Sequence, residues 1–481
     1  MRVLRLLLLA SLLVPLTAGC GSPEPTAPPT AVAAASTTAV VQTPTPPPTE
    51  RPTEIPTLPP TETATDTPQP SPTLVPTLPA PTATDEPTPE AAGMPSTELL
   101  KTWERIEFEM EMLRGLDETT PITRTLMTPE ELVAYLEREF EEEYPPQEIK
   151  NDVRVLAAFD FVPEDYDLRQ VLLDLYASEV LGFYEDEEDT FYVVNTGEFD
   201  LLDEMTFAHE YVHGLQDQAF DLETFIDEDE LDDDAALARL ALVEGDASLA
   251  MTEYLMRHIY ELSDEELASL GEEEVAASEA AMNAAPAILR ETLLFPYTYG
   301  SEFVTVLQVE GWEAVDAAFA DPPQSTEQIL HPEKYLTRDE PELVSLPPLT
   351  DTLGAGWERI ESENLGEFQI GLYLAQQVDR ATAEAAAAGW DGDRYAVYVH
   401  GDDEVLAFAT VWDSETDRDE FVAAYEGYAE AKYQQPASRS EDDQMWWQGE
   451  GQVTVLRWDE TGVLLVVGPD VTVVEQVLGA F

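Results

Sequence analysis

Apolar residues recur every three or four positions through much of residues 96–345, which predicts a helix-rich region. The first predicted helix has its apolar stripe at Leu99, Trp103, Ile106, Met110 and Leu113. The next begins at Thr128-Pro-Glu-Glu131, with a capping Thr, Pro at the first helical position and acids facing the helix dipole. Further helices are predicted over 168–178, over 235–260 with Asp233 or Asp234 as the cap, and from Phe295 onward.

Strand patterns interrupt these helices. The segments 182–184 and 190–194 are rich in aromatic and β-branched residues and flank the acidic turn 185–189, which predicts a β-hairpin. An exposed strand edge can hold an extended peptide through main-chain hydrogen bonds. The same pattern is equally typical of an ordinary sheet edge.

The composition shifts after the predicted linker 341–348. Two similar halves follow, each reading strand, strand, helix: 395–400, 405–412 and 417–431, then 452–458, 462–467 and 471–481. A helix is predicted before them over 365–388. This pattern predicts a small α+β domain over 346–481 with its helices on one sheet face. We find no candidate chemistry in it, so packing against the rest of the chain and binding a partner are both open.

The first 19 residues predict a secretory signal peptide. Arg2 and Arg5 precede an apolar run over 6–13 that is too short to span a membrane. The ending Leu16-Thr-Ala-Gly-Cys20 resembles a bacterial lipobox, although Thr17 stands where Leu is usual. The resemblance implies that Cys20 is lipidated and anchors the mature protein to a membrane. Cys20 is the only cysteine, so an intramolecular disulfide is excluded. The alternative is an ordinary secretory signal followed by an accidental Cys.

Residues 20–95 consist mainly of Pro, Thr and Ala and predict a disordered spacer. Over the whole chain, 23 Lys and Arg oppose 99 Asp and Glu, a net charge of −76. Such a charge argues against nucleic acid and anionic membrane surfaces as partners. It is typical of a solvated acidic surface, and also of proteins from high-salt habitats or proteins that bind divalent cations.

The most specific motif is Phe207-Ala-His-Glu-Tyr-Val-His-Gly214. On a helix, residues four apart lie only about 40° from each other, so His209 and His213 can reach one metal ion. Two imidazoles with a carboxylate beside the first form the HExxH arrangement, which binds Zn²⁺ and uses Glu210 to accept a proton from an activated water. The alternative is a coincidental match on an ordinary amphipathic helix.

A third ligand is expected on the helix predicted over 235–260. Its segment Leu240-Ala-Leu-Val-Glu-Gly-Asp-Ala247 places Glu244 among apolar residues, where a carboxylate is costly unless paired or bound to metal. Gly245 lowers helix stability, so it indicates close packing at that point. The acidic loop 227–234 before this helix is either a solvated loop or a Ca²⁺ site.

Together these segments resemble the gluzincin zinc peptidases, in which HExxH is followed by a helix bearing a ligand Glu. The resemblance implies a zincin-like domain over 96–345, Zn²⁺ held by His209, His213 and Glu244, and Glu210 as general base. The separation of 31 residues between His213 and Glu244 is longer than in the thermolysin-like and aminopeptidase members.

The segment Phe295-Pro-Tyr-Thr-Tyr-Gly300 extends the resemblance to gluzincin aminopeptidases. It implies that Tyr297 hydrogen-bonds the oxyanion formed during catalysis; the alternative is aromatic packing at a helix start. The Gly-x-Met-Glu-Asn segment that holds a free amino terminus in those enzymes is missing from this sequence, so exopeptidase action is not supported. His331, in the irregular polar stretch 322–335, is a further candidate hydrogen-bond donor, although a lone His in such a turn is more often structural.

The sequence therefore predicts an extracytoplasmic, lipid-anchored zinc endopeptidase acting on peptides or proteins. The alternative is a surface lipoprotein that keeps a zincin fold without turnover and serves as a binding or structural module. Glu210 favours the enzyme, because a protein that only binds metal has no need of a carboxylate that is not a ligand.

Overall fold

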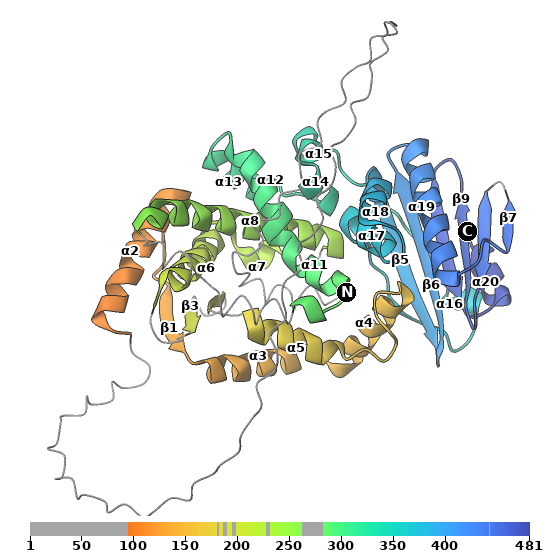
Figure 1. Ribbon diagram of the computed structural model, residues 1–481, viewed down its shortest axis with the longest axis horizontal. Coiled ribbons are helices and arrows are strands. Elements are labelled where there is room, and N and C mark those ends of the chain that lie inside the picture. Colours follow the sequence, from red (N-terminus) through yellow and green to blue (C-terminus); the bar gives the residue numbers. More distant parts are fainter. Residues whose placement is uncertain are drawn as a thin grey trace, which may run out of the picture. The chain divides into compact units, whose positions relative to one another are not determined.

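A computed structural model describes residues 95–179, 182–185, 190–194, 199–227, 231–261, 282–441 and 443–481. The predicted signal peptide, Cys20 and nearly all of the predicted spacer lie outside these residues. The described part mixes helices and sheets, which confirms the α+β class (Figure 1). Within it, no helix has the length and apolar character needed to cross a membrane.

Helices dominate the chain up to residue 337. In chain order the elements are α2 (Thr97–Arg114), β1 (Thr123–Met127), α3 (Pro129–Glu143), α4 (Pro146–Ala158), α5 (Leu168–Glu179), β2 (Gly182–Glu185), β3 (Thr190–Val194), α6 (Leu201–Phe220), α7 (Leu222–Phe225), α8 (Asp233–His258), η2 (Ile259–Glu261), α11 (Ala287–Phe295), η3 (Pro296–Gly300), α12 (Ser301–Gln308), α13 (Trp312–Ala320), α14 (Thr326–Leu330) and α15 (Pro332–Thr337). The predicted start of α3 is confirmed, since Thr128 and Glu131 form a reciprocal capping box. Helix α4 was not predicted.

The predicted hairpin is confirmed: β2 pairs antiparallel with β3. Part of its acidic turn, 186–189, lies outside the described residues. Strand β1 was missed, and it pairs in parallel with β3 to give the order β1-β3-β2. None of its side chains is fully buried and its partner is distant in sequence, so no local pattern marks it. Within the part of the chain that the structure describes, β2 is therefore an edge of this sheet.

The long helix α8 begins at Asp233, two residues earlier than predicted. Its N-cap is Asp232, whose side chain accepts a hydrogen bond from the Ala235 amide. Asp234, proposed as a cap, is buried instead and accepts hydrogen bonds from the backbone amide and the hydroxyl of Thr326 on α14. A tertiary contact therefore decides the role of this carboxylate.

The prediction that the segment from Phe295 opens a helix is wrong. Helix α11 continues through a π-helical turn, η3, into α12. Pro296 lacks an N–H, and it lies inside the helical run at the start of a π-turn, a feature frequent at functional sites.

Helix α8 crosses η3 at two glycines, as Gly245 had indicated. A Cβ on Gly245 would lie 2.3 Å from the Gly300 carbonyl, and one on Gly300 would lie 2.1 Å from the Ala241 carbonyl oxygen. Neither position has room for a side chain. The two backbones touch directly after Glu244, so the crossing holds the Tyr297 turn beside this residue.

Two further predictions need correction. The stretch 322–335 is not irregular, because Ser325 caps α14 and Pro332 begins α15. The helix predicted over 365–388 is two helices, α17 (Gly366–Ala375) and α18 (Arg380–Ala387). Asp379 separates them, because its carboxylate accepts a hydrogen bond from the Thr382 amide and starts a new helix.

The C-terminal part is built on a seven-stranded antiparallel sheet with strand order β4-β5-β6-β10-β9-β8-β7. Its remaining elements are α16 (Thr350–Leu353), β4 (Glu358–Glu361), β5 (Trp390–His400), β6 (Asp403–Trp412), α19 (Glu415–Tyr433), β7 (Arg439–Glu441), β8 (Gln444–Gln448), β9 (Val453–Trp458), β10 (Gly462–Gly468) and α20 (Val471–Leu478). Both predicted strand-strand-helix halves are confirmed. Strands β4, β7 and β8 were missed.

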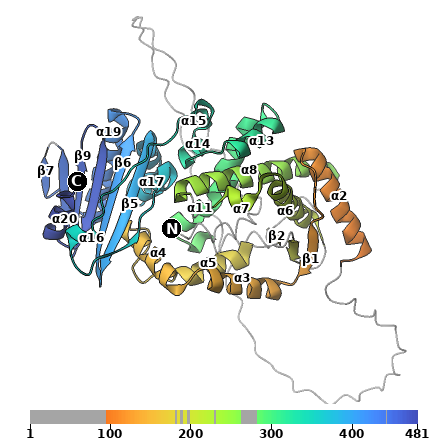
Figure 2. The same ribbon diagram turned by 180° about the vertical axis from the view of Figure 1, so that it is seen from behind.

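The prediction that the helices lie on one sheet face is wrong. Tyr395 and Val397 of β5 pack with α17, α18 and α19. The alternate residues Ala396 and Tyr398 face the other side, in the core that contains Val474 of α20. Successive strand residues point to opposite faces, so α20 lies on the face opposite α19 (Figure 2).

Candidate metal centre

Helix α6 carries the predicted motif. Its N-cap is Asp200, which forms a capping box with Asp203, and its buried face packs against β3 and α8. His209 and His213 are each 5% exposed, and Glu210 is 0% exposed. Three polar side chains therefore lie inside the protein, on a helix whose other buried residues are mostly apolar.

Helix α8 brings Glu244 to the two histidines. The Glu244 Oε2 atom lies 3.1 Å from the His209 Nε2 atom and 3.5 Å from the His213 Nε2 atom. The two Nε2 atoms are 3.0 Å apart. Ligands in a tetrahedral zinc site, at about 2.0–2.1 Å from the ion, lie roughly 3.3 Å from one another. These three atoms therefore have the chemistry and the spacing to hold a zinc ion.

Glu210 lies beside this triangle. One of its carboxylate oxygens is within 4.8 Å of a ring nitrogen of both His209 and His213, so by distance alone Glu210 could also hold a metal ion. The Glu244 Oε2 atom is the better ligand candidate, because it lies 3.1 and 3.5 Å from the two Nε2 atoms. Burial, and then the charge of Glu244, raise the pKa of Glu210 well above its ordinary value, while the backbone of Tyr184 on β2 acts in the opposite direction. This carboxyl group thus lies near the metal-binding atoms and near the backbone of strand β2.

The charges of the three metal-binding groups depend on one another. Burial raises the pKa of Glu244, but His213 and His209 outweigh it and lower the pKa to about 2. Burial lowers the pKa of His209. Burial also acts to lower the pKa of His213, but Glu244 and Gln216 outweigh it and raise that pKa. A carboxylate beside a neutral imidazole is the protonation state in which both groups bind metal.

The two tyrosines of η3 face different surroundings. The Tyr297 ring lies 6.1 Å from the His209 ring, and Tyr297 is half-buried. The Tyr299 ring instead packs 5.2 Å from Phe295 and 6.0 Å from Phe368. Tyr297 is therefore the tyrosine of this turn that borders the histidine cluster.

His331 belongs to a different neighbourhood. Its Nε2 atom hydrogen-bonds the Glu367 Oε1 atom on α17 at 2.9 Å, and this bond raises the pKa of His331. Among the described residues, no hydrogen bond, ion pair or ring contact joins His331 to the cluster of His209 and His213. The structure thus brings together the other predicted site residues that it describes, but not His331.

Three buried residues behind the cluster were missed. Gln216 contacts the His213 ring, Asp246 contacts Gln216, and Arg114 from the end of α2 contacts Asp246. The sequence offered a signal for each. Gln216 follows His213 by three positions, Asp246 follows Glu244 by two, and Arg114 directly follows the last apolar residue of the α2 stripe in a chain with few cations.

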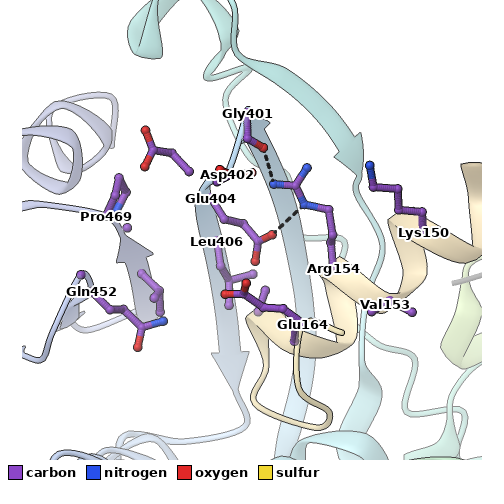
Figure 3. A pocket seen from close by; sticks show the side chains of 16 residues that line it. Lys150, Val153, Arg154, Glu164, Gly401, Asp402, Glu404, Leu406, Gln452 and Pro469 are labelled. Carbon is purple, nitrogen blue, oxygen red and sulfur yellow. Dashed lines mark hydrogen bonds and ion pairs between the residues drawn. The ribbon is translucent and has the colours of Figure 1, made fainter. Parts of the chain in front are cut away.

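A cavity of about 360 Å³ lies elsewhere, between α4 and the ends of C-terminal strands (Figure 3). Arg154 of α4 reaches across it and donates hydrogen bonds to the Gly401 carbonyl oxygen at 3.0 Å and to Glu404 at 3.3 Å. This cavity shares no residue with the histidine cluster. The Arg154 guanidinium that lines it already has hydrogen-bond partners within the protein.

Comparison with known proteins reaches only the C-terminal part. Residues 353–478 match a family described as a domain of unknown function, DUF8575. No curated protein and no solved structure matches the chain. The matched segment contains neither the histidines of the cluster nor Glu210, Glu244 and Tyr297.

Proposed function

We propose that the protein is a zinc-dependent peptidase, an endopeptidase with a zincin-like domain over residues 96–345. The observation that carries the proposal is the convergence of the His209, His213 and Glu244 ligand atoms beside the buried carboxyl group of Glu210. Metal-assisted hydrolysis requires ligands that hold the ion and a nearby group that accepts a proton from water. Helices α6 and α8 supply the ligands, and Glu210 supplies the proton acceptor.

The roles follow from position. Zinc held by these groups would supply a Lewis acid that polarises the scissile carbonyl and acidifies a water. Glu210 accepts the proton of the attacking water, which forms a bond to the carbonyl carbon, and then delivers this proton to the leaving amine as the peptide bond breaks. The raised pKa of Glu210 suits it to the first step, because a more basic carboxylate is a better proton acceptor.

Strand β2 supports the peptide substrate class. It is an edge of the three-stranded sheet as described. The backbone of its Tyr184 acts to lower the pKa of Glu210, which indicates that the strand lies near this carboxyl group. An extended peptide paired with this edge would run past the carboxyl group through main-chain hydrogen bonds, which any peptide can make. Such recognition suits an endopeptidase, since it needs no chain terminus.

The direct test is digestion of a mixed peptide library by the purified full chain, with the products read by mass spectrometry. Cleavage at internal bonds is expected, and a chelator should abolish it. An intact library would favour the alternative of a zincin-fold binding protein without turnover.

Replacing Tyr297 with Phe should lower kcat by about 10²- to 10³-fold, the usual effect of losing one oxyanion donor. The phenol next to His209 would donate a hydrogen bond to the carbonyl oxygen as that oxygen gains negative charge. Because the bond strengthens only in the transition state, KM, zinc content and melting temperature should stay near wild type. Steady-state kinetics with a peptide substrate measures this.

Tyr299→Phe is the matched control. Its ring packs on Phe295 and Phe368, away from the cluster, so kcat should be unchanged. A silent Tyr297→Phe combined with a damaging Tyr299→Phe would show that the role belongs to the other tyrosine.

We also propose that Cys20 carries a lipid that anchors the protein outside the cytoplasm. The support is the lipobox-like end of the predicted signal peptide and the placement of the only cysteine there. Cells fed a labelled fatty acid should label the full-length protein but not Cys20→Ser. Label that persists in Cys20→Ser would leave residues 1–19 as an ordinary secretory signal.

A further inference from the structure

The Gln216 side chain has only one workable orientation. Its amide nitrogen lies 3.0 Å from the Val243 carbonyl oxygen and 2.8 Å from the Asp246 Oδ2 atom. Both neighbours accept hydrogen bonds, so the NH₂ group must face them. The opposite orientation would point the amide oxygen at two other oxygens in a fully buried site. The Gln216 Oε1 atom is therefore directed at His213.

This orientation determines which nitrogen of His213 carries a proton. The Gln216 Oε1 atom is 2.8 Å from the His213 Nδ1 atom, and a carbonyl oxygen can only accept. Nδ1 must therefore donate an N–H, which leaves the Nε2 lone pair of the neutral ring free. Nε2 is the nitrogen that faces His209 and Glu244. The free lone pair thus points at the proposed zinc position.

Asp246 is itself held from outside α6 and α8. The Arg114 Nε atom donates to its Oδ1 atom at 2.5 Å, and both side chains are 0% exposed. Arg114 also contacts Asp316 at 2.7 Å and lies 4.7 Å from the centre of the Trp312 ring. This buried guanidinium fixes Asp246, and the chain of contacts from Arg114 through Asp246 to Gln216 ends on His213.

Of the two histidines, only His213 has its Nδ1 atom hydrogen-bonded by Gln216. The His209 Nδ1 atom is buried and has no hydrogen-bond partner among the described residues. A general packing role for Gln216 would not explain why its oxygen meets a ring nitrogen while its nitrogen meets two acceptors. We propose that Gln216, oriented by Asp246 and Arg114, is a positioning residue that fixes His213 in the tautomer that binds zinc.

This inference rests on the proposed function, so zinc affinity is measured first on the full chain, by competition with a chromophoric chelator. Gln216→Met keeps the side-chain length but cannot accept from Nδ1, and it should weaken zinc binding by about 10- to 100-fold, as expected for a partner of a metal ligand. Gln218→Met, which loses hydrogen bonds to Thr119 and Thr120 on the exposed side of α6, should keep wild-type affinity.

Equal zinc affinity in wild type and Gln216→Met would overturn the positioning role while leaving the proposed function standing. A wild-type chain that binds no zinc would overturn both.

A second measurement needs no folded Gln216 variant. The chain has five histidines, so ¹⁵N-histidine labelling of the metal-free wild type gives few ring signals, and His213 is assigned by its loss in His213→Ala. Against the effect of burial, Glu244 and Gln216 raise the pKa of His213, so the spectrum is recorded at alkaline pH, where the ring is neutral. The long-range ¹H–¹⁵N pattern of His213 should then show a proton on Nδ1 alone. A proton on Nε2 instead would overturn the inference.

Discussion

Replacing Glu210 with glutamine is expected to reduce kcat for peptide hydrolysis by about 10²- to 10⁴-fold, the usual contribution of a general acid-base group. The amide has nearly the same shape but cannot accept a proton from water. Glu210 lies outside the three converging ligand atoms, so zinc should stay bound. Burial of an amide costs less than burial of a charged carboxylate, so the melting temperature should not fall.

Turnover and zinc content should be measured on the same preparation of this variant. Glu223→Gln on the short helix α7 is the control, because this exposed residue has the same chemistry away from the cluster. A Glu210→Gln protein that loses zinc would make Glu210 a ligand, and one with unchanged turnover would remove it from the mechanism.

Replacing His213 with alanine should remove zinc from the protein and abolish peptide cleavage. Only His209 and Glu244 of the converging groups would remain, and two ligands hold zinc far more weakly than three. Because zinc binds the folded state, the wild type should also melt at a higher temperature with zinc than without, and the variant should lose this difference. Elemental analysis and a thermal melt measure both effects.

His258→Ala is the matched control for this experiment. His258 lies on α8 and pairs with Glu109 at 2.7 Å, outside the cluster. Its loss should leave zinc content at the wild-type level. Full zinc occupancy in His213→Ala would contradict the ligand assignment.

Local spacing was enough to predict much of the candidate centre. His209 and His213 lie one helical turn apart, and Glu244 is an acid within an apolar stretch of its helix. Both features can be read from the sequence alone. The capping box at Thr128 and the β2-β3 hairpin were equally local, because their partners are neighbours in sequence.

The missed features depend on partners that are far apart in the chain. Arg114 reaches Asp246 across 132 positions, and β1 pairs with a strand more than sixty residues away. The pattern predicted both strand-strand-helix halves, but it could not say that α20 covers the sheet face opposite α19. Local patterns do not specify which distant segment completes a contact.

The most direct measurement is a titration of zinc into chelator-treated full-length protein while cleavage of a peptide found in the library digest is followed. Cleavage should rise in proportion to added zinc and reach its plateau at one zinc per chain. Cleavage by the metal-free protein, or none with one zinc bound per chain, would contradict the account.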